Sequence, residues 1–123
     1  MTATVAEQFV DAFARRDRAA LLALFTPGVD FRGMTPGRFW EASSPEQLVD
    51  EVLLDWLAEE DVVTEVLAVD RDWMVDREHV SYRFAVSTPD GPHVVEQQAY
   101  LMIEDGRIAW LRSMCSGFRK VDH

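Results

Sequence analysis

Near the C-terminal end of the chain, small and apolar side chains occupy almost every second position of three consecutive segments. Such alternation predicts β-strands with one buried face, and short turns between them predict an antiparallel sheet. Three polar groups intrude on this face, those of Tyr82, Gln97 and Ser113. A mostly apolar concave surface with a few polar groups is typical of small-molecule sites. The segments are Val80–Ser87, Val94–Ile103 and Ile108–Cys115, and the face holds Val80, Tyr82, Phe84, Val86, Val95, Ala99, Leu101, Ile103, Ala109, Leu111 and Cys115.

Two turns set the expected pairing of these strands. The Pro89–Pro92 turn signal predicts Phe84 opposite Gln97. The segment Glu104–Gly106 fits a three-residue hairpin, which would place Gln97 opposite Ser113. Both turns predict the same buried face, so the sequence favours one register.

The N-terminal half alternates between helical and extended patterns. Apolar residues at helical spacing predict an opening helix, and a Ser44-Pro45-Glu46-Gln47 capping box predicts a later one. Between them we expect a brief strand and a loop that serves as a lid. The expected elements are helices at 5–15, 18–25 and 44–58, a strand at 29–31, a loop at 33–43 and strands at 62–71 and from 73 into 80–87.

Length and composition limit the class of protein. The 123 residues fit one domain, and the net charge of −10 disfavours nucleic acid and anionic membranes as partners. Because no apolar run is long enough to cross a bilayer and no signal peptide is evident, we expect a cytoplasmic protein. The single Cys115 cannot form an internal disulfide, and we expect no metal or cofactor. The three histidines, expected to be solvated, are His79, His93 and His123.

Two segments, AFARRDRAALLALFTPGVDF and AYLMIEDGRIAWLRSM, are similar to the SnoaL-like branch of the NTF2-like superfamily. This resemblance covers nearly the whole chain and implies an α+β fold, in which a curved antiparallel sheet wraps around N-terminal helices to form a conical cavity. It specifies the fold better than the activity, because the superfamily holds isomerases, cyclases, dehydratases, hydrolases and proteins without catalysis.

The ketosteroid isomerases of this superfamily allow a comparison residue by residue. Their resemblance places a tyrosine donor, a general-base aspartate and a protonated aspartate on Phe9, Gly33 and Ala99 of this sequence. None of these residues can donate or accept the proton required. We therefore do not expect carboxylate chemistry of the ketosteroid-isomerase type.

Six residues are candidates for ligand contact, and each also has a plainer interpretation. Tyr82, Gln97 and Ser113 would offer hydrogen bonds on the apolar face, or would satisfy one another in the core. Aromatic side chains in or near the lid would form the pocket wall or the core, and an arginine there would suit a carboxylate or a phenolate. Cys115 lacks a base on its face of the sheet and is not expected to be a nucleophile. The other three candidates are Trp40, Trp56 and Arg38.

These features predict a cavity for a small apolar, aromatic or polyketide-like molecule. Two functions remain open at this point: a cofactor-free cyclase, isomerase or hydrolase, and a non-catalytic binding or accessory module. On the outward face, Tyr100 is expected opposite Trp110 and Met102 opposite Ile108. Since the resemblance implies dimers that pack sheet to sheet, we expect a homodimer through Tyr100, Trp110 and Met114.

Overall fold

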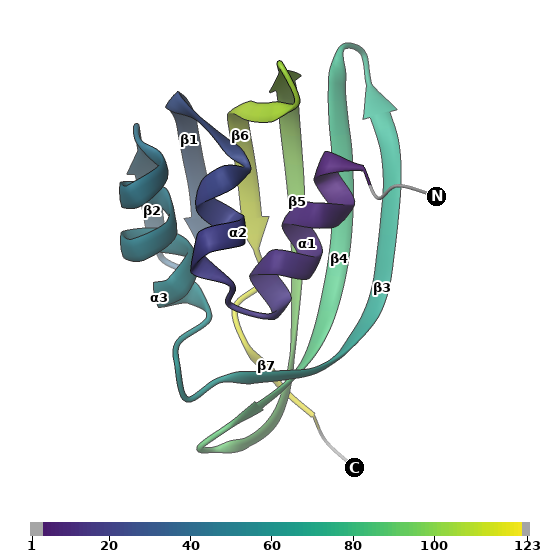
Figure 1. Ribbon diagram of the computed structural model, residues 1–123. Coiled ribbons are helices and arrows are strands. Elements are labelled where there is room, and N and C mark those ends of the chain that lie inside the picture. The colour runs from purple at the N-terminus through teal and green to yellow at the C-terminus, as the bar shows by residue number, and fades with distance from the viewer. Residues whose placement is uncertain (1–3, 122–123) are drawn as a thin grey trace.

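The computed structural model describes residues 4–121 and shows three helical segments packed on one face of a curved sheet (Figure 1). The first two segments are α1 (Val5–Ala14) and α2 (Arg18–Ala23). The third consists of the π-helix η1 (Gln47–Leu53) followed directly by α3 (Leu54–Trp56). The strands are β1 (Phe25–Thr35), β2 (Arg38–Ala42), β3 (Val62–Met74), β4 (Arg77–Thr88), β5 (Gly91–Glu104), β6 (Arg107–Cys115) and β7 (Arg119–Lys120).

Each helical segment begins where the sequence offers a capping side chain. Thr4 and Glu7 form a capping box at α1, and the Asp17 carboxylate accepts from the backbone of Ala20 in α2. The Ser44 hydroxyl accepts from the backbone N–H of Gln47, as the capping box predicts. The helix expected over 44–58 is divided into the π-helix and one α-helical turn, a difference that the apolar pattern does not reveal.

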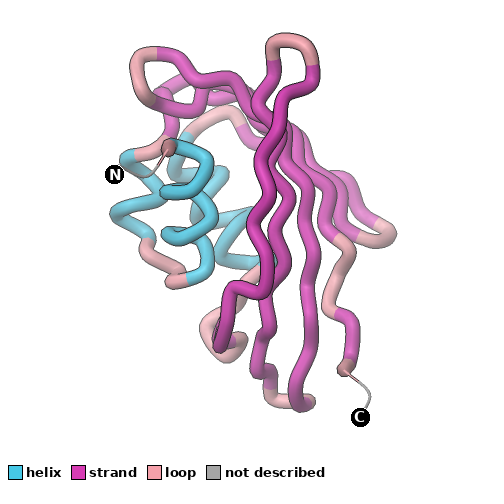
Figure 2. Tube along the Cα trace, turned by 90° about the vertical axis from the view of Figure 1, so that its right-hand side faces the viewer, coloured by secondary structure: helices cyan, strands magenta, loops and turns pink. Residues whose placement is uncertain are grey.

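The strand order is β2-β1-β6-β5-β4-β3, with β7 paired to β5. All pairs are antiparallel except β1 with β6, which run parallel. The helices cover one side of this sheet and leave the other side uncovered (Figure 2). This arrangement confirms the expected α+β fold with a curved, mostly antiparallel sheet.

The segment predicted to be a loop at 33–43 is instead a β-hairpin of β1 and β2. Its turn is Pro36-Gly37, and Gly37 has a φ of 78°, a conformation that glycine adopts without steric cost. A proline followed by a glycine at positive φ is a turn signal. The loop expected over 33–43 is therefore wrong.

The predicted register between β4 and β5 is wrong by two residues. Tyr82, not Phe84, lies opposite Gln97, while Phe84 lies opposite Val95. Because side chains alternate with a period of two, this shift leaves every residue on its predicted face. Tyr82 and Gln97 thus both point toward the helices, as expected, but they lie opposite each other.

The β5–β6 hairpin has a tighter turn than predicted. Asp105 and Gly106 both have positive φ, as in the two-residue turns that join antiparallel strands, so the three-residue turn is wrong. The β5–β6 pairing also has an irregularity between Met102 and Ile103, and it exchanges the faces on which Ile103 and Ile108 lie. Ile103 is 41 % exposed although it was expected inside, and Ile108 is fully buried although it was expected outside.

Beyond the irregularity, Gln97 lies opposite Cys115, and Ser113 lies opposite Ala99. The expected Gln97–Ser113 pair is therefore wrong, again by a shift of two residues. On the outward face, Tyr100 lies opposite Arg112 and Met102 opposite Trp110, so the expected pairs Tyr100–Trp110 and Met102–Ile108 are wrong. The side chains of Gln97, Ala99, Ser113 and Cys115 point toward the helices.

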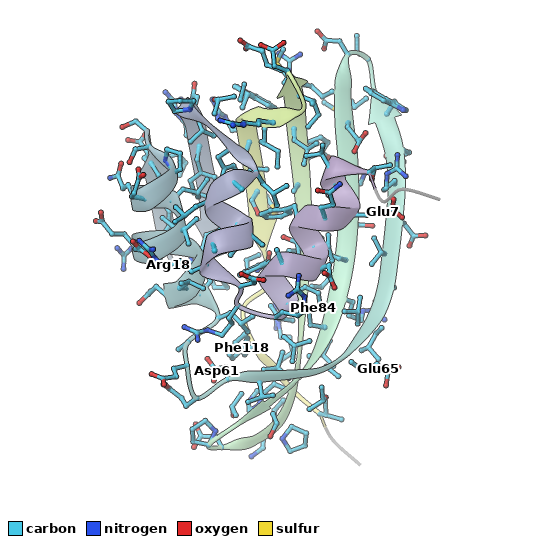
Figure 3. All side chains as sticks on the ribbon, in the orientation of Figure 1. Glu7, Arg18, Asp61, Glu65, Phe84 and Phe118 are labelled. Carbon is cyan, nitrogen blue, oxygen red and sulfur yellow. The ribbon has the colours of Figure 1, made fainter. Side chains whose placement is uncertain are left out.

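Aromatic rings fill the space between the helices and the sheet. Phe9 and Phe13 of α1 contact Tyr82 edge to face, and Phe13 contacts Phe84 with 6.0 Å between ring centroids. Phe84 is labelled in Figure 3. Phe9 also meets Phe25 edge to face. Edge-to-face contacts of this kind add to the free energy gained from burying the rings. The deep part of the expected cone is therefore packed core.

A short chain of polar groups crosses this core. The Tyr82 hydroxyl donates to Oε1 of Gln97, and Nε2 of Gln97 donates to Sγ of Cys115 at 3.3 Å. The backbone N–H of Gly117 also donates to that sulfur. Burial raises the pKa of the Tyr82 phenol well above its ordinary value, and the nearby Cys115 thiol adds to the rise.

We expect Phe84→Ala to lower the free energy of unfolding by about 3–5 kcal/mol, because it leaves a cavity next to Phe13. Phe39→Ala is the matched control, since Phe39 is 57 % exposed and its loss should cost about 0.5 kcal/mol or less. Urea denaturation followed by circular dichroism measures both values. Equal losses in the two variants would contradict the packing described here.

We expect Tyr82 to make stability fall at alkaline pH. Its pKa is raised on folding, so the stability it contributes is fully present below the unfolded-state pKa of about 10 and is lost as the pH rises through the folded-state value. Urea unfolding at several alkaline pH values should show this slope in the wild type and in Tyr100→Phe, and a smaller one in Tyr82→Phe. Since the chain has two tyrosines, tyrosinate absorbance of Tyr100→Phe reports Tyr82 alone and should appear only with unfolding.

Candidate functional site

The β1–β2 hairpin carries a stack of side chains at the helix side of the sheet. The Arg38 guanidinium lies over the indole of Trp40, 3.4 Å from the ring centroid. The Trp40 Nε1–H donates to Oγ1 of Thr35 at 2.8 Å, which fixes the ring against β1. Arg38 is exposed and has no ion pair within residues 4–121, so its charge is available to an anionic group.

Trp56 of α3 lies next to this stack and packs onto Gly33 of β1. Its ring meets Trp40 at 82° and Phe31 at 60°, with 6.0 Å between centroids in each pair. A Cβ built at Gly33 would lie 2.6 Å from Cζ of Phe31 and 2.9 Å from Cη2 of Trp56. The missing side chain of Gly33 is thus what lets the indole pack against the sheet.

The indole nitrogen of Trp56 is buried and has no hydrogen-bond partner in the described part of the chain. A buried donor left without an acceptor costs roughly 1–3 kcal/mol. The Trp40 nitrogen next to it is satisfied by Thr35. The indole nitrogens of Trp40 and Trp56 therefore differ, because the first is satisfied within the chain and the second is not.

Ser113 of β6 completes this group. In the parallel pairing of β1 with β6, its Cα lies beside that of Gly33. The side chain is half-buried and makes no hydrogen bond to the residues that the structure describes. We call Arg38, Trp40, Trp56 and Ser113, arranged around Gly33, the mouth cluster.

Four of the six predicted ligand residues thus meet in the mouth cluster, and two do not. Tyr82 and Gln97 are each 2 % exposed and bond to each other in the core, as the plainer interpretation of them held. Trp73 of β3 is 67 % exposed. Thr35 and Gly33 were not predicted as parts of a site. The Pro36-Gly37 turn could have revealed Thr35, because a hairpin turning there brings Thr35 opposite Arg38.

The positions matched to ketosteroid isomerase catalysis hold no ionisable side chain. Phe9 and Ala99 are buried in the core, and the place of the base is Gly33, covered by Trp56. Among residues 4–121, no group of three or more metal-ligating side chains comes together. In the same part of the chain, no helix is long and apolar enough to cross a membrane.

His79 is less solvated than expected. It lies on the outward face with its side chain 17 % exposed, where Nδ1 is 2.7 Å from Oδ1 of Asp72 and Nε2 is 2.9 Å from Oε1 of Gln98. Its ring stacks on Tyr100. The half-buried His93 bonds locally to Thr88 and Gly91. His123 lies outside the described residues.

Solved structures of similar shape share the fold at low sequence identity. An NTF2-like protein from Burkholderia thailandensis has a TM-score of 0.69 at 18 % identity, with 94 % of this chain and 93 % of that chain covered. A proposed polyketide cyclase from Pseudomonas putida has a TM-score of 0.67 at 16 % identity, with 91 % of each chain covered. A protein of ketosteroid isomerase-like fold from Catenulispora acidiphila, in complex with trimethylamine, has a TM-score of 0.66 at 15 % identity, with 94 % and 88 % covered.

No curated protein matches the sequence. The family model of the SnoaL-like domain matches residues 6–111, which include nearly all of the helices and of the sheet. The sequence motifs, the curved sheet around its helices and this match agree. The chain belongs to the SnoaL-like domain family, within the NTF2-like superfamily.

Proposed function

We propose that this chain, as one domain, binds a small, planar, largely apolar molecule at the mouth cluster. The observation that carries the proposal is the wall of Trp40 and Trp56, flanked by the unpaired guanidinium of Arg38. Flat aromatic walls bind planar molecules, and a guanidinium binds a carboxylate or a phenolate with charge-assisted hydrogen bonds. Aromatic and polyketide-like molecules combine both features.

Similar structures support binding of a small molecule in this fold. One neighbour is described as a proposed polyketide cyclase and another holds trimethylamine. For this chain we propose binding, with any cyclase, isomerase or hydrolase activity depending on shape and hydrogen bonds, without a metal or cofactor. We place this function in the cytoplasm, which the single unpaired Cys115 and the acidic composition support.

The proposal predicts that 2-naphthoate binds the wild type and that Arg38→Gln weakens the binding about tenfold, because one charge-assisted interaction is lost. Isothermal titration calorimetry measures both affinities. Arg107→Gln is the matched control, since exposed Arg107 lies at the β5–β6 turn, away from the mouth cluster. Absence of binding by the wild type would contradict the proposal, and equal weakening in both variants would show only non-specific attraction to positive charge.

The uncovered face of the sheet supports a second proposal, a homodimer. Met34, Met102 and Met114 are 47 %, 38 % and 59 % exposed there. Beside them Tyr100 stacks on His79, and Trp110 lies under two guanidiniums, those of Arg77 and Arg112. Methionine, aromatic residues and arginine are the types enriched at protein interfaces. We propose that two copies pack through Tyr100, Trp110 and Met114, an arrangement that would also serve the alternative function of a non-catalytic accessory module.

We expect light scattering to give twice the 14.0 kDa mass of one chain at micromolar concentration. Trp110→Arg should yield the single-chain mass, because it places a third cation beside Arg77 and Arg112. Trp73→Arg, on β3, changes a tryptophan that lies outside the patch and should leave the dimer intact. A wild type of single-chain mass removes the dimer proposal.

A further inference from the structure

The uncovered face of the sheet has a hollow of about 350 Å³ over strands β1, β2, β5 and β6. That volume lies at the lower end of the range found for small-molecule sites. The helices lie on the other side of the sheet (Figure 2), so this outer hollow is separate from the rings of Trp40 and Trp56. Its walls are formed by Arg32, Met34, Phe39, Tyr100, Arg112 and Met114.

An apolar row of side chains forms one wall of the outer hollow. Met34 of β1 lies opposite Phe39 of β2 and beside Met114 of β6, and all three side chains are exposed. Because side chains alternate between the two faces of a sheet, the paired residues Gly33 and Ser113 line the hollow with backbone atoms. Methionine side chains are flexible and adapt to irregular apolar shapes. This wall therefore suits an alkyl chain.

The opposite wall of the outer hollow supplies hydrogen-bond donors. Arg32 of β1 lies beside Arg112 of β6. The Arg32 Nε is 3.8 Å from Oε1 of Glu41, and its guanidinium makes no hydrogen bond to residues 4–121. The hydrogen bonds that Arg112 makes within the described chain, to Asp30 and to the backbone of Leu111, all come from Nη1. Both guanidiniums therefore keep N–H groups that can donate to an incoming acceptor.

The charges beside the outer hollow favour a ligand with a single negative charge. The carboxylates of Asp30 and Glu41 lie next to the guanidiniums of Arg112 and Arg32, so the two charges of each sign nearly cancel. A polyanion gains little from such a surface, because the carboxylates repel its further charges. One carboxylate group can still accept charge-assisted hydrogen bonds from the free N–H groups at short range.

We propose that the outer hollow binds an amphiphilic carboxylate, with the carboxylate on the two arginines and the alkyl chain along the apolar row. The outer hollow is a second site, on the other face of the sheet, and it does not depend on ligand binding at the mouth cluster. Tyr100 and Met114 of its walls also belong to the patch proposed for the homodimer. The ligand and a second copy of the chain therefore compete for the same surface.

The test titrates octanoate into protein labelled with ¹³C at the methionine methyl groups. Nuclear magnetic resonance then reports each methionine separately, and single methionine-to-leucine substitutions assign the signals. We expect octanoate to shift the signals of Met34 and Met114, which line the outer hollow. The exposed Met74 and Met102 do not line it and should shift little, so they serve as controls within the same sample.

Affinities from the same titrations test the role of the arginines. In the wild type, octanoate should bind about tenfold more tightly than 1-octanol, which has the same chain without the charge. Arg32→Gln should weaken octanoate binding about fivefold, because one of the two guanidiniums remains, and should leave 1-octanol binding unchanged. Arg83→Gln is the matched control, since Arg83 is an exposed, ion-paired arginine of the same face that does not line the outer hollow.

Light scattering adds a measurement of the competition. In a dimeric wild type, saturating octanoate should lower the mass toward that of one chain, and a dimer that keeps its mass would overturn the proposal. Equal shifts at Met34, Met74, Met102 and Met114, or equal weakening by Arg32→Gln and Arg83→Gln, would overturn it as well, because octanoate would then bind only as a non-specific amphiphile. The mouth cluster is tested separately, by 2-naphthoate and Arg38→Gln, so neither result decides the other.

Discussion

The alternation of apolar and polar side chains along β4, β5 and β6 determines how the rest of the protein packs. It turns one set of side chains toward the helices, where Phe9 and Phe13 complete an aromatic core, and turns the other set outward. The mouth cluster lies to one side of this core, where Trp56 of α3 packs on the β1–β2 hairpin.

The faces of the strands could be predicted from the sequence, but their pairing could not. A shift of two residues between Tyr82 and Gln97 keeps both side chains inside, so the apolar pattern is the same in either register. Only the turn conformation decides between them. At the β5–β6 hairpin the tighter turn at Asp105-Gly106 and the irregularity after Met102 exchange the environments of Ile103 and Ile108. The alternation of apolar and polar residues does not indicate where such an irregularity occurs.

The candidate site was predictable in part, for a related reason. Arg38 and Trp40 stand near each other in the sequence, within a segment rich in glycine, proline and aromatic residues, and this composition is a local signal. Trp56 meets Gly33 only because α3 folds back over β1, and such a contact has no local signature. The unpartnered indole nitrogen is a property of three-dimensional packing alone. The sequence could indicate that Trp56 belongs to a pocket wall or to the core, but it could not indicate that the indole N–H has no acceptor.

An enzyme that forms an enolate needs two kinds of group in its site, and the mouth cluster offers only one of them. Donors aimed at an oxygen stabilise the negative charge that develops on it, and a base within reach removes the proton from the adjacent carbon. The side chains of Ser113 and Arg38, which make no hydrogen bond to residues 4–121, offer donors of the first kind. At the position where the related isomerases carry the base, Gly33 has no side chain, and the Trp56 ring takes the space that one would need. Trp56 therefore excludes a base from that position, and this packing disfavours deprotonation of a bound carbonyl compound by this route.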